Sequence, residues 1–232
     1  MKRSTFIIGI LAFAVSFSAC QNKTSKTEAK DSLLDMSSDS STMGMDTNSM
    51  MSGIDTNSMV SEIGKARERM MENMHQFKMT GNIDYDLISM LKFHHQGAVK
   101  MAKLELELGT EPKQKQIARN IINKQAKEIQ MLDFLLGQSN KTKNYEPSNK
   151  ETGLGKDMHE NMMQMMNMEA VSPGTPDHEF TSMMIKHDKD GIDMGRIIVK
   201  YSRTERFKAM AKNMIDDQTK EITELEKTID HH

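Results

Sequence analysis

Residues 120–132 read NIINKQAKEIQML, and residues 213–225 repeat this pattern as NMIDDQTKEITEL. The two stretches lie about 93 residues apart without a gap, a spacing too long for a solenoid unit and typical of a duplicated half-domain. The same spacing relates Ser89 to Ser182, Met90 to Met183, His94 to His187, and Met101 to Met194. The chain is therefore expected to contain two similar halves, at about 61–138 and about 156–230.

Each half has the pattern of two helices. Apolar residues recur every three or four positions from Leu87 to Leu108 and again from Ala118 to Leu136, which predicts two amphipathic helices in the first half. Either Asp84 or Asp86 is expected to cap the first of them. The second half copies the pattern, and neither half has a strand signature.

Two helical hairpins with one narrow apolar face each can bury those faces only against one another. The predicted fold class is therefore all-α, a ferritin-like four-helix bundle made of two duplicated hairpins. A methionine-rich helix is expected before each half, near residues 61–78 and 156–170. The resulting domain spans residues 61–232.

The N-terminal segment has the features of an export signal. Lys2 and Arg3 precede an uncharged apolar run, which ends in small residues directly before Cys20. We expect residues 1–19 to be a lipoprotein-type signal peptide and Cys20 to carry the lipid anchor; an ordinary signal peptide is the alternative. The expected location is a bacterial envelope membrane, facing the periplasm or the cell surface. Residues 20–60 are rich in Met, Ser and Asp and are expected to form a disordered tether.

Composition narrows the function. The net charge of −2 argues against nucleic acid as a partner, because phosphate binding needs a basic surface. A single Cys excludes an internal disulfide and a thiolate cluster. The chain has 25 methionines, and thioether sulfur selects Cu(I) and similar soft ions. Any metal site is thus expected to use Met, His and carboxylates.

The candidate ligands fall into two sets. The helices that precede the halves contribute Met70, Met71, Met74, His75, Met158, His159, Met162, Met163 and Met166. The repeated hairpins contribute Met90, His94, His95, Met101, Met131, Met183, His187 and Met194. Gln125, Glu128, Gln218 and Glu221 lie on or beside the apolar stripes of the second helices and are expected to support these ligands. Ordinary core packing is the alternative for the methionines of the hairpins, since Met also fills helical cores.

The segment Ser89-Met-Leu-Lys-Phe-His-His-Gln-Gly-Ala98, together with Gln125-Ala-Lys-Glu-Ile-Gln-Met-Leu132, resembles the secreted ferritin-like family called domain of unknown function 305. The resemblance covers about residues 65–230. It implies a bundle of two similar hairpins marked by a His-His motif, and some members are periplasmic copper-binding proteins. The second half departs from the motif: His187-Asp188 replaces His-His, and Glu224 stands where the first half has Met131.

These features favour a non-catalytic binder. Ferritin-like di-iron enzymes need two Glu-x-x-His motifs, whereas this chain has one, at Glu72 to His75, so a ferroxidase is the less favoured class. We expect an extracytoplasmic protein that binds copper, mainly as Cu(I) with Cu(II) or Ag(I) as alternatives, for sequestration, tolerance or handover to a copper efflux or handover protein. The alternative is an envelope interaction protein with methionine-rich partner-binding helices.

Overall fold

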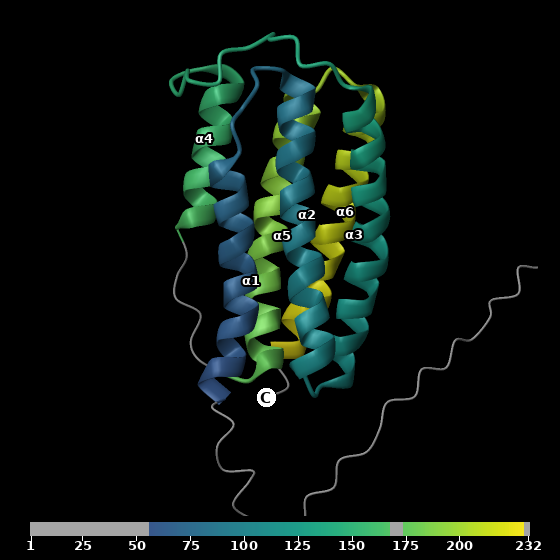
Figure 1. The fold of residues 1–232 in the computed structure, drawn as a ribbon. Coiled ribbons are helices and arrows are strands. Elements are labelled where there is room, and N and C mark those ends of the chain that lie inside the picture. Colours follow the sequence, from purple (N-terminus) through teal and green to yellow (C-terminus); the bar gives the residue numbers. More distant parts are fainter. Residues whose placement is uncertain (1–55, 168–173, 230–232) are drawn as a thin grey trace, which may run out of the picture. The chain divides into compact units, whose positions relative to one another are not determined.

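The computed structural model describes residues 56–167 and 174–229, and this part of the chain contains helices and no strand (Figure 1). The helices are α1 (Thr56–Gln76), α2 (Ile83–Leu108), α3 (Pro112–Gln138), α4 (Gly153–Met166), α5 (Pro176–Tyr201) and α6 (Glu205–Ile229). The predicted all-α fold class is confirmed. The predicted signal peptide, Cys20 and most of the predicted tether lie outside the described residues.

Two hairpins form the bundle, as the repeat predicts. α2 pairs with α3 and α5 pairs with α6, and the hairpins meet through contacts of α2 with α5 and of α3 with α6. The methionine-rich helices add a further layer, in which α1 packs on α2 and α5 while α4 packs on α5 (Figure 1). α1 begins earlier than the predicted residue 61, and α4 spans 14 residues and ends before the predicted residue 170.

The cap of α2 differs from the prediction. The N-cap is Asn82, whose side-chain oxygen accepts a hydrogen bond from the Tyr85 amide. Asp86 instead accepts hydrogen bonds from the Thr80 and Gly81 amides in the turn before the helix. An Asn at this position satisfies one of the free amides of the first turn, which leaves the nearby carboxylates available for other contacts.

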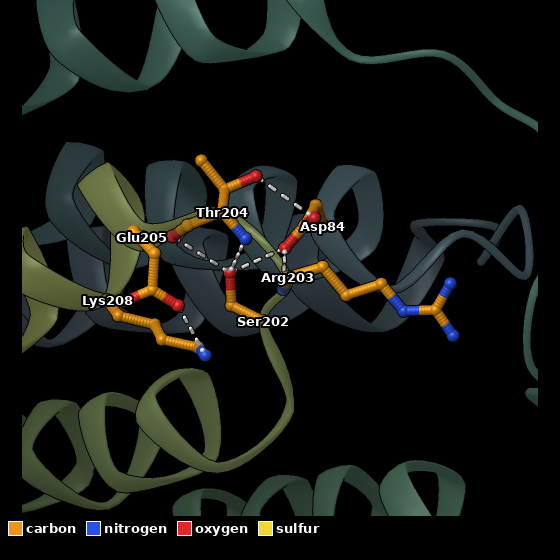
Figure 2. A network of polar contacts seen from close by, with 6 residues as sticks. All are labelled: Asp84, Ser202, Arg203, Thr204, Glu205 and Lys208. Carbon is orange, nitrogen blue, oxygen red and sulfur yellow. Dashed lines mark hydrogen bonds and ion pairs between the residues drawn. The ribbon is translucent and has the colours of Figure 1, made fainter.

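Asp84 and its repeat counterpart Asp177 each bind the turn before a helix of the other half. In Figure 2, Asp84 of α2 accepts hydrogen bonds from the Ser202 hydroxyl at 2.5 Å, the Arg203 amide at 3.0 Å and the Thr204 hydroxyl at 3.1 Å, just before α6. Asp177 of α5 accepts from the amides of Thr110 and Glu111, just before α3. The positive end of the helix dipole favours a carboxylate near each of these helix starts. These two contacts tie the hairpins together reciprocally.

The apolar core is divided into two clusters. The first contains Met90 and Met194, and the second contains Met101 and Met183. The repeat relates Met90 to Met183 and Met101 to Met194. Because α2 and α5 are antiparallel, Met90 instead shares a cluster with Met194, and Met101 shares one with Met183. Each cluster thus contains one buried methionine of this repeated set from α2 and one from α5, and the histidines of α2 and α5 lie in the sequence between them.

Gly97 and Gly191 allow close packing, as their positions inside helices suggest. A Cβ atom at Gly97 would collide with the side chain of Met70 on α1, and a Cβ atom at Gly191 would lie 2.8 Å from Nε2 of Gln218 on α6. Met70 is therefore a packing residue that fixes α1 against α2. Within the described residues, no helix is both long and apolar enough to cross a membrane.

Candidate metal site

The methionine-rich helices meet in one surface groove. The end of α1, the turn that follows it, the segment before α4 and the inner face of α4 enclose a hollow of about 230 Å³. Its lining includes four thioethers and two imidazoles, from Met74, His75, Met79, Met158, His159 and Met162. We call this hollow the α1–α4 groove. Two ligand clusters that lie far apart in the sequence are therefore brought together in the fold.

Helical spacing explains the α4 side of this groove. Met158 and Met162 are four residues apart and so lie on the same face of the helix, one turn apart. Both are half-buried, as is the adjacent His159. Leu154 and Met165 of the same helix are buried and fix the face that α4 turns towards the bundle. On the α1 side Met74 is buried and His75 is exposed, so the donors range from the wall of the core to solvent.

Two contacts fix the walls of the groove. The guanidinium of Arg67 on α1 donates a hydrogen bond of 2.5 Å to the Met165 carbonyl near the end of α4, where helix carbonyls lack partners. The hydroxyl of Tyr145, which lines the groove, donates at 2.8 Å to Asp86 at the start of α2. Both interactions cross long stretches of sequence, so the groove is a product of the tertiary fold.

The lining contains no carboxylate and no thiolate; its other residues are Phe77, Tyr145, Pro147, Lys150 and Gly155. Thioether sulfur and neutral imidazole bring no negative charge to a bound ion. Such a thioether-rich donor set suits a soft ion such as Cu(I) or Ag(I) better than a hard ion, which prefers oxygen ligands.

The two histidines shared by the halves lie at the centre of the bundle. The rings of His94 and His187 are stacked with their centroids 3.7 Å apart and their planes inclined by 19°. Both side chains are buried and none of their four ring nitrogens has a hydrogen-bond partner. Burial lowers the pKa of His94 and of His187 well below the usual range of histidine, and neighbouring positive groups act in the same direction. Both rings are therefore neutral near pH 7.

The neighbours of these histidines differ between the halves. In the first half, Glu128 lies 3.0 Å from Nε2 of the buried His95, close enough for an ion pair but without the direction of a hydrogen bond. In the second half, Asp188 and Glu221 replace this pair with two carboxyl groups. Burial raises the pKa of Asp188 well above its usual value, and the adjacent Glu221 raises it further. Burial raises the pKa of Glu221 to about 7.

The amides Gln125 and Gln218 complete the polar layer, and both are buried with unpartnered side-chain atoms. The layer thus contains the predicted supporting residues of both halves. Within residues 56–167 and 174–229, however, no three His, Cys, Asp or Glu side chains are gathered so that they could hold a metal ion.

The sequence of the hairpins decides the family. The model of the family described as Domain of unknown function (DUF305) matches residues 84–229. The chain belongs to the DUF305 family. In this DUF305 chain the match includes α4 but excludes α1, so Met74, His75 and Met79 of the α1–α4 groove lie outside it. No curated protein sequence matches the chain.

Two solved structures resemble the DUF305 chain. They are CopM in an Ag-bound form obtained by soaking and CopM in a Cu(I)-bound form. The identities are 23% and 22%, and in both cases the TM-score is 0.46, with 62% of this chain and 93% of that chain covered.

The remaining candidate ligands lie apart from the groove. Met70 is buried, whereas Met71 and Met131 are half-buried against the first core cluster. Met163 and Met166 are exposed on the outer side of α4, where they line a shallow hollow of their own with Gln164 and Asn167. Met101 and Met183 are buried at the other end of the bundle.

Met79 is the groove donor that the sequence did not identify. It lies in the turn between α1 and α2, beyond the last residue expected for the first methionine-rich helix. Its sequence signal was present: Met79 continues the run of methionines at the end of α1 after a gap of four residues.

Proposed function

We propose that this chain binds Cu(I), with Ag(I) as a second soft ion, in the α1–α4 groove, and that it sequesters copper or passes it on without catalysing a reaction. The observation that supports the proposal most directly is the convergence of four thioethers and two imidazoles on one hollow. Core packing alone does not account for this arrangement, because His75 is exposed and Met158, His159 and Met162 are only half-buried.

The ligand types also suit the proposed location. Thioethers do not bind protons, so they remain available as ligands in acid, where imidazole and thiolate are lost to protonation. A methionine-rich site would therefore keep its affinity for copper outside the cytoplasm. We propose that the chain is exported and anchored through Cys20 to an envelope membrane, facing the periplasm or cell surface, on the basis of the signal features of residues 1–20.

The anchor makes a prediction for cell fractionation. Cys20→Ser should move the chain from the membrane fraction to the soluble fraction, because it removes the sulfur that would carry the lipid. Immunoblotting of the two fractions measures the change, with the unmodified chain as reference. A Cys20→Ser chain that stays with the membrane would contradict lipid attachment at this residue.

The metal proposal is tested by competition under anaerobic conditions. Metal-free full-length chain is titrated with Cu(I) or Ag(I) against a chromophoric chelator, and with Zn(II) in a parallel series. We expect uptake of the monovalent soft ions at free concentrations below about 1 μM, equivalent to more than about 8 kcal/mol of binding free energy, and much weaker uptake of Zn(II). Equal affinity for Zn(II), or no uptake of Cu(I) below the micromolar range, would refute the proposal.

A further inference from the structure

A second, smaller cavity adjoins the α1–α4 groove and shares two lining methionines with it. It has a volume of about 10 Å³, which is room for one ion or one water molecule. Four methionines from three helices line it: Met90 of α2, Met158 and Met162 of α4, and Met194 of α5. Leu87, Ile197 and Asn161 complete the wall. We call this space the inner cavity.

The inner cavity is continuous in its lining with the groove. Met158 and Met162 contribute to both, whereas Met90 and Met194 belong to the inner cavity alone and are almost fully buried, with 3% and 4% of their surface exposed. The two α4 methionines thus lie between the groove donors, of which His75 is exposed, and the buried methionines Met90 and Met194. A rotation of these flexible side chains would present the same sulfur atoms to either side.

The chemistry of this cavity is selective. No titratable side chain lines it, so an ion inside would be stabilised only by soft donors and dipoles. An unbalanced divalent ion is strongly disfavoured in such a place, whereas a monovalent ion that bonds well to sulfur is tolerated. The amide nitrogen of the buried Asn161 has no hydrogen-bond partner, which marks an unsatisfied polar group in this wall.

We propose that the inner cavity is a distinct all-thioether site for one Cu(I) or Ag(I) ion, which receives the ion from the α1–α4 groove through Met158 and Met162. This inference rests on the proposed function and adds a second, buried stage to it. The groove would exchange ions with solvent, and the inner cavity would retain them, because release requires the ion to return past the α4 methionines.

The repeat supplies a matched control. Met101 and Met183 are the counterparts of Met194 and Met90, and both are buried in the second core cluster. Neither residue lines the inner cavity or the groove. The test variant is Met90→Leu/Met194→Leu. The control variant, Met101→Leu/Met183→Leu, makes the same two changes at the opposite end of the same two helices. Replacement of Met by Leu nearly conserves volume and is well tolerated in cores.

The experiment is an Ag(I) titration of the full-length chain labelled with ¹³C at the methionine methyl groups. Silver is diamagnetic and not oxidised, so the shift of each methyl resonance reports ligation directly. The resonances are assigned by single Met→Leu replacements, and circular dichroism checks that each variant keeps its helicity. The bound silver per chain is counted by metal analysis after desalting.

We expect the methyl groups of Met74 and Met79 to shift with the first ions and those of Met90 and Met194 to shift with a later one. The double variant Met90→Leu/Met194→Leu should retain one silver ion fewer per chain than the unmodified protein, whereas Met101→Leu/Met183→Leu should retain the same number. If Met74 and Met79 shift but Met90 and Met194 do not, or both double variants bind as the unmodified protein does, the inner site is refuted and the groove stands. If no groove methyl responds, the proposed function itself fails.

Discussion

Replacing both Met158 and Met162 by leucine should lower the affinity for Cu(I) by about 100-fold or more, the largest effect that we expect from any two substitutions. The two residues supply two of the six donors in the α1–α4 groove and half of the thioethers of the inner cavity. Loss of ordinary ligands typically costs at least as much as loss of supporting groups, for which 10- to 100-fold is common. A 100-fold loss corresponds to about 2.7 kcal/mol.

The outer face of the same helix provides the control. Met163→Leu with Met166→Leu changes two methionines that are 52% and 53% exposed and do not line the groove. Leucine and methionine have similar helix propensities, so both double variants should retain the helicity of α4. Chelator competition measures the Cu(I) affinity of each. Equal losses in the two variants would mean that ions bind to α4 as a whole and would contradict a site on its inner face.

Much of the fold follows from the sequence because its signals are local. Periodic apolar residues from Leu87 to Leu108, followed by Gly109 and Pro112, predict a helix and its end without knowledge of the rest of the chain. The repeat then supplies the second hairpin. α2 spans Ile83–Leu108 and includes the whole predicted stripe from Leu87 to Leu108, and α5 spans Pro176–Tyr201 in the second half.

The cap of α2 shows where local reasoning fails. Asp84 has the residue type and position of an N-cap, but its carboxylate binds the start of α6, some 120 residues away. That contact depends on how the two hairpins pack, and no spacing rule within one helix reveals it. Asn82 fills the cap instead.

The sequence predicted that Met and His would form the candidate site, but only in part which of these residues lie together. Methionines that look alike in the sequence have different roles: Met70 packs on Gly97, Met158 lines the groove and Met166 faces solvent. The rotation of α1 and α4 about their own axes decides among these roles, and it is set by contacts such as that of Arg67 with the Met165 carbonyl. Periodicity is uninformative here because methionine occurs on every side of α4.

A second large effect is expected from a buried acid that lines neither the α1–α4 groove nor the inner cavity. Glu105 of α2 is fully buried, and neither of its carboxyl oxygens has a donor partner. Burial, together with the adjacent Asp177, raises the pKa of Glu105 to about 9 from an ordinary value of 4.5. Near neutral pH the group is therefore protonated in the folded chain and can donate its proton to Asp177, which binds the turn before α3.

The pKa of Glu105 is higher in the folded chain than in the unfolded chain, and this decides how the free energy of unfolding changes with pH. Below pH 4.5 both the folded and the unfolded chain hold the proton, and the full stability is present. Between pH 4.5 and about 9 only the folded chain holds it, so the free energy of unfolding falls as the pH rises. Glu179 contributes in the same direction, since burial raises its pKa to about 7. The buried His94 and His187, whose pKa values are lowered, oppose this trend only below about pH 6.5.

The variant Glu105→Gln separates the contribution of Glu105 to the pH dependence of stability from the contributions of the other buried titratable groups. Glutamine has the shape of the protonated acid, can donate to Asp177 and does not titrate, so the variant should be more stable than the unmodified chain at pH 8 by on the order of 3 kcal/mol. At pH 5 the difference should fall to about 1 kcal/mol or less, because this pH is only half a unit above the ordinary pKa of 4.5. Urea unfolding at the two pH values measures it, with the exposed Glu107→Gln on the same helix as control. A gain that is equal at both pH values would show that packing, and not the proton on Glu105, couples the stability of this bundle to pH.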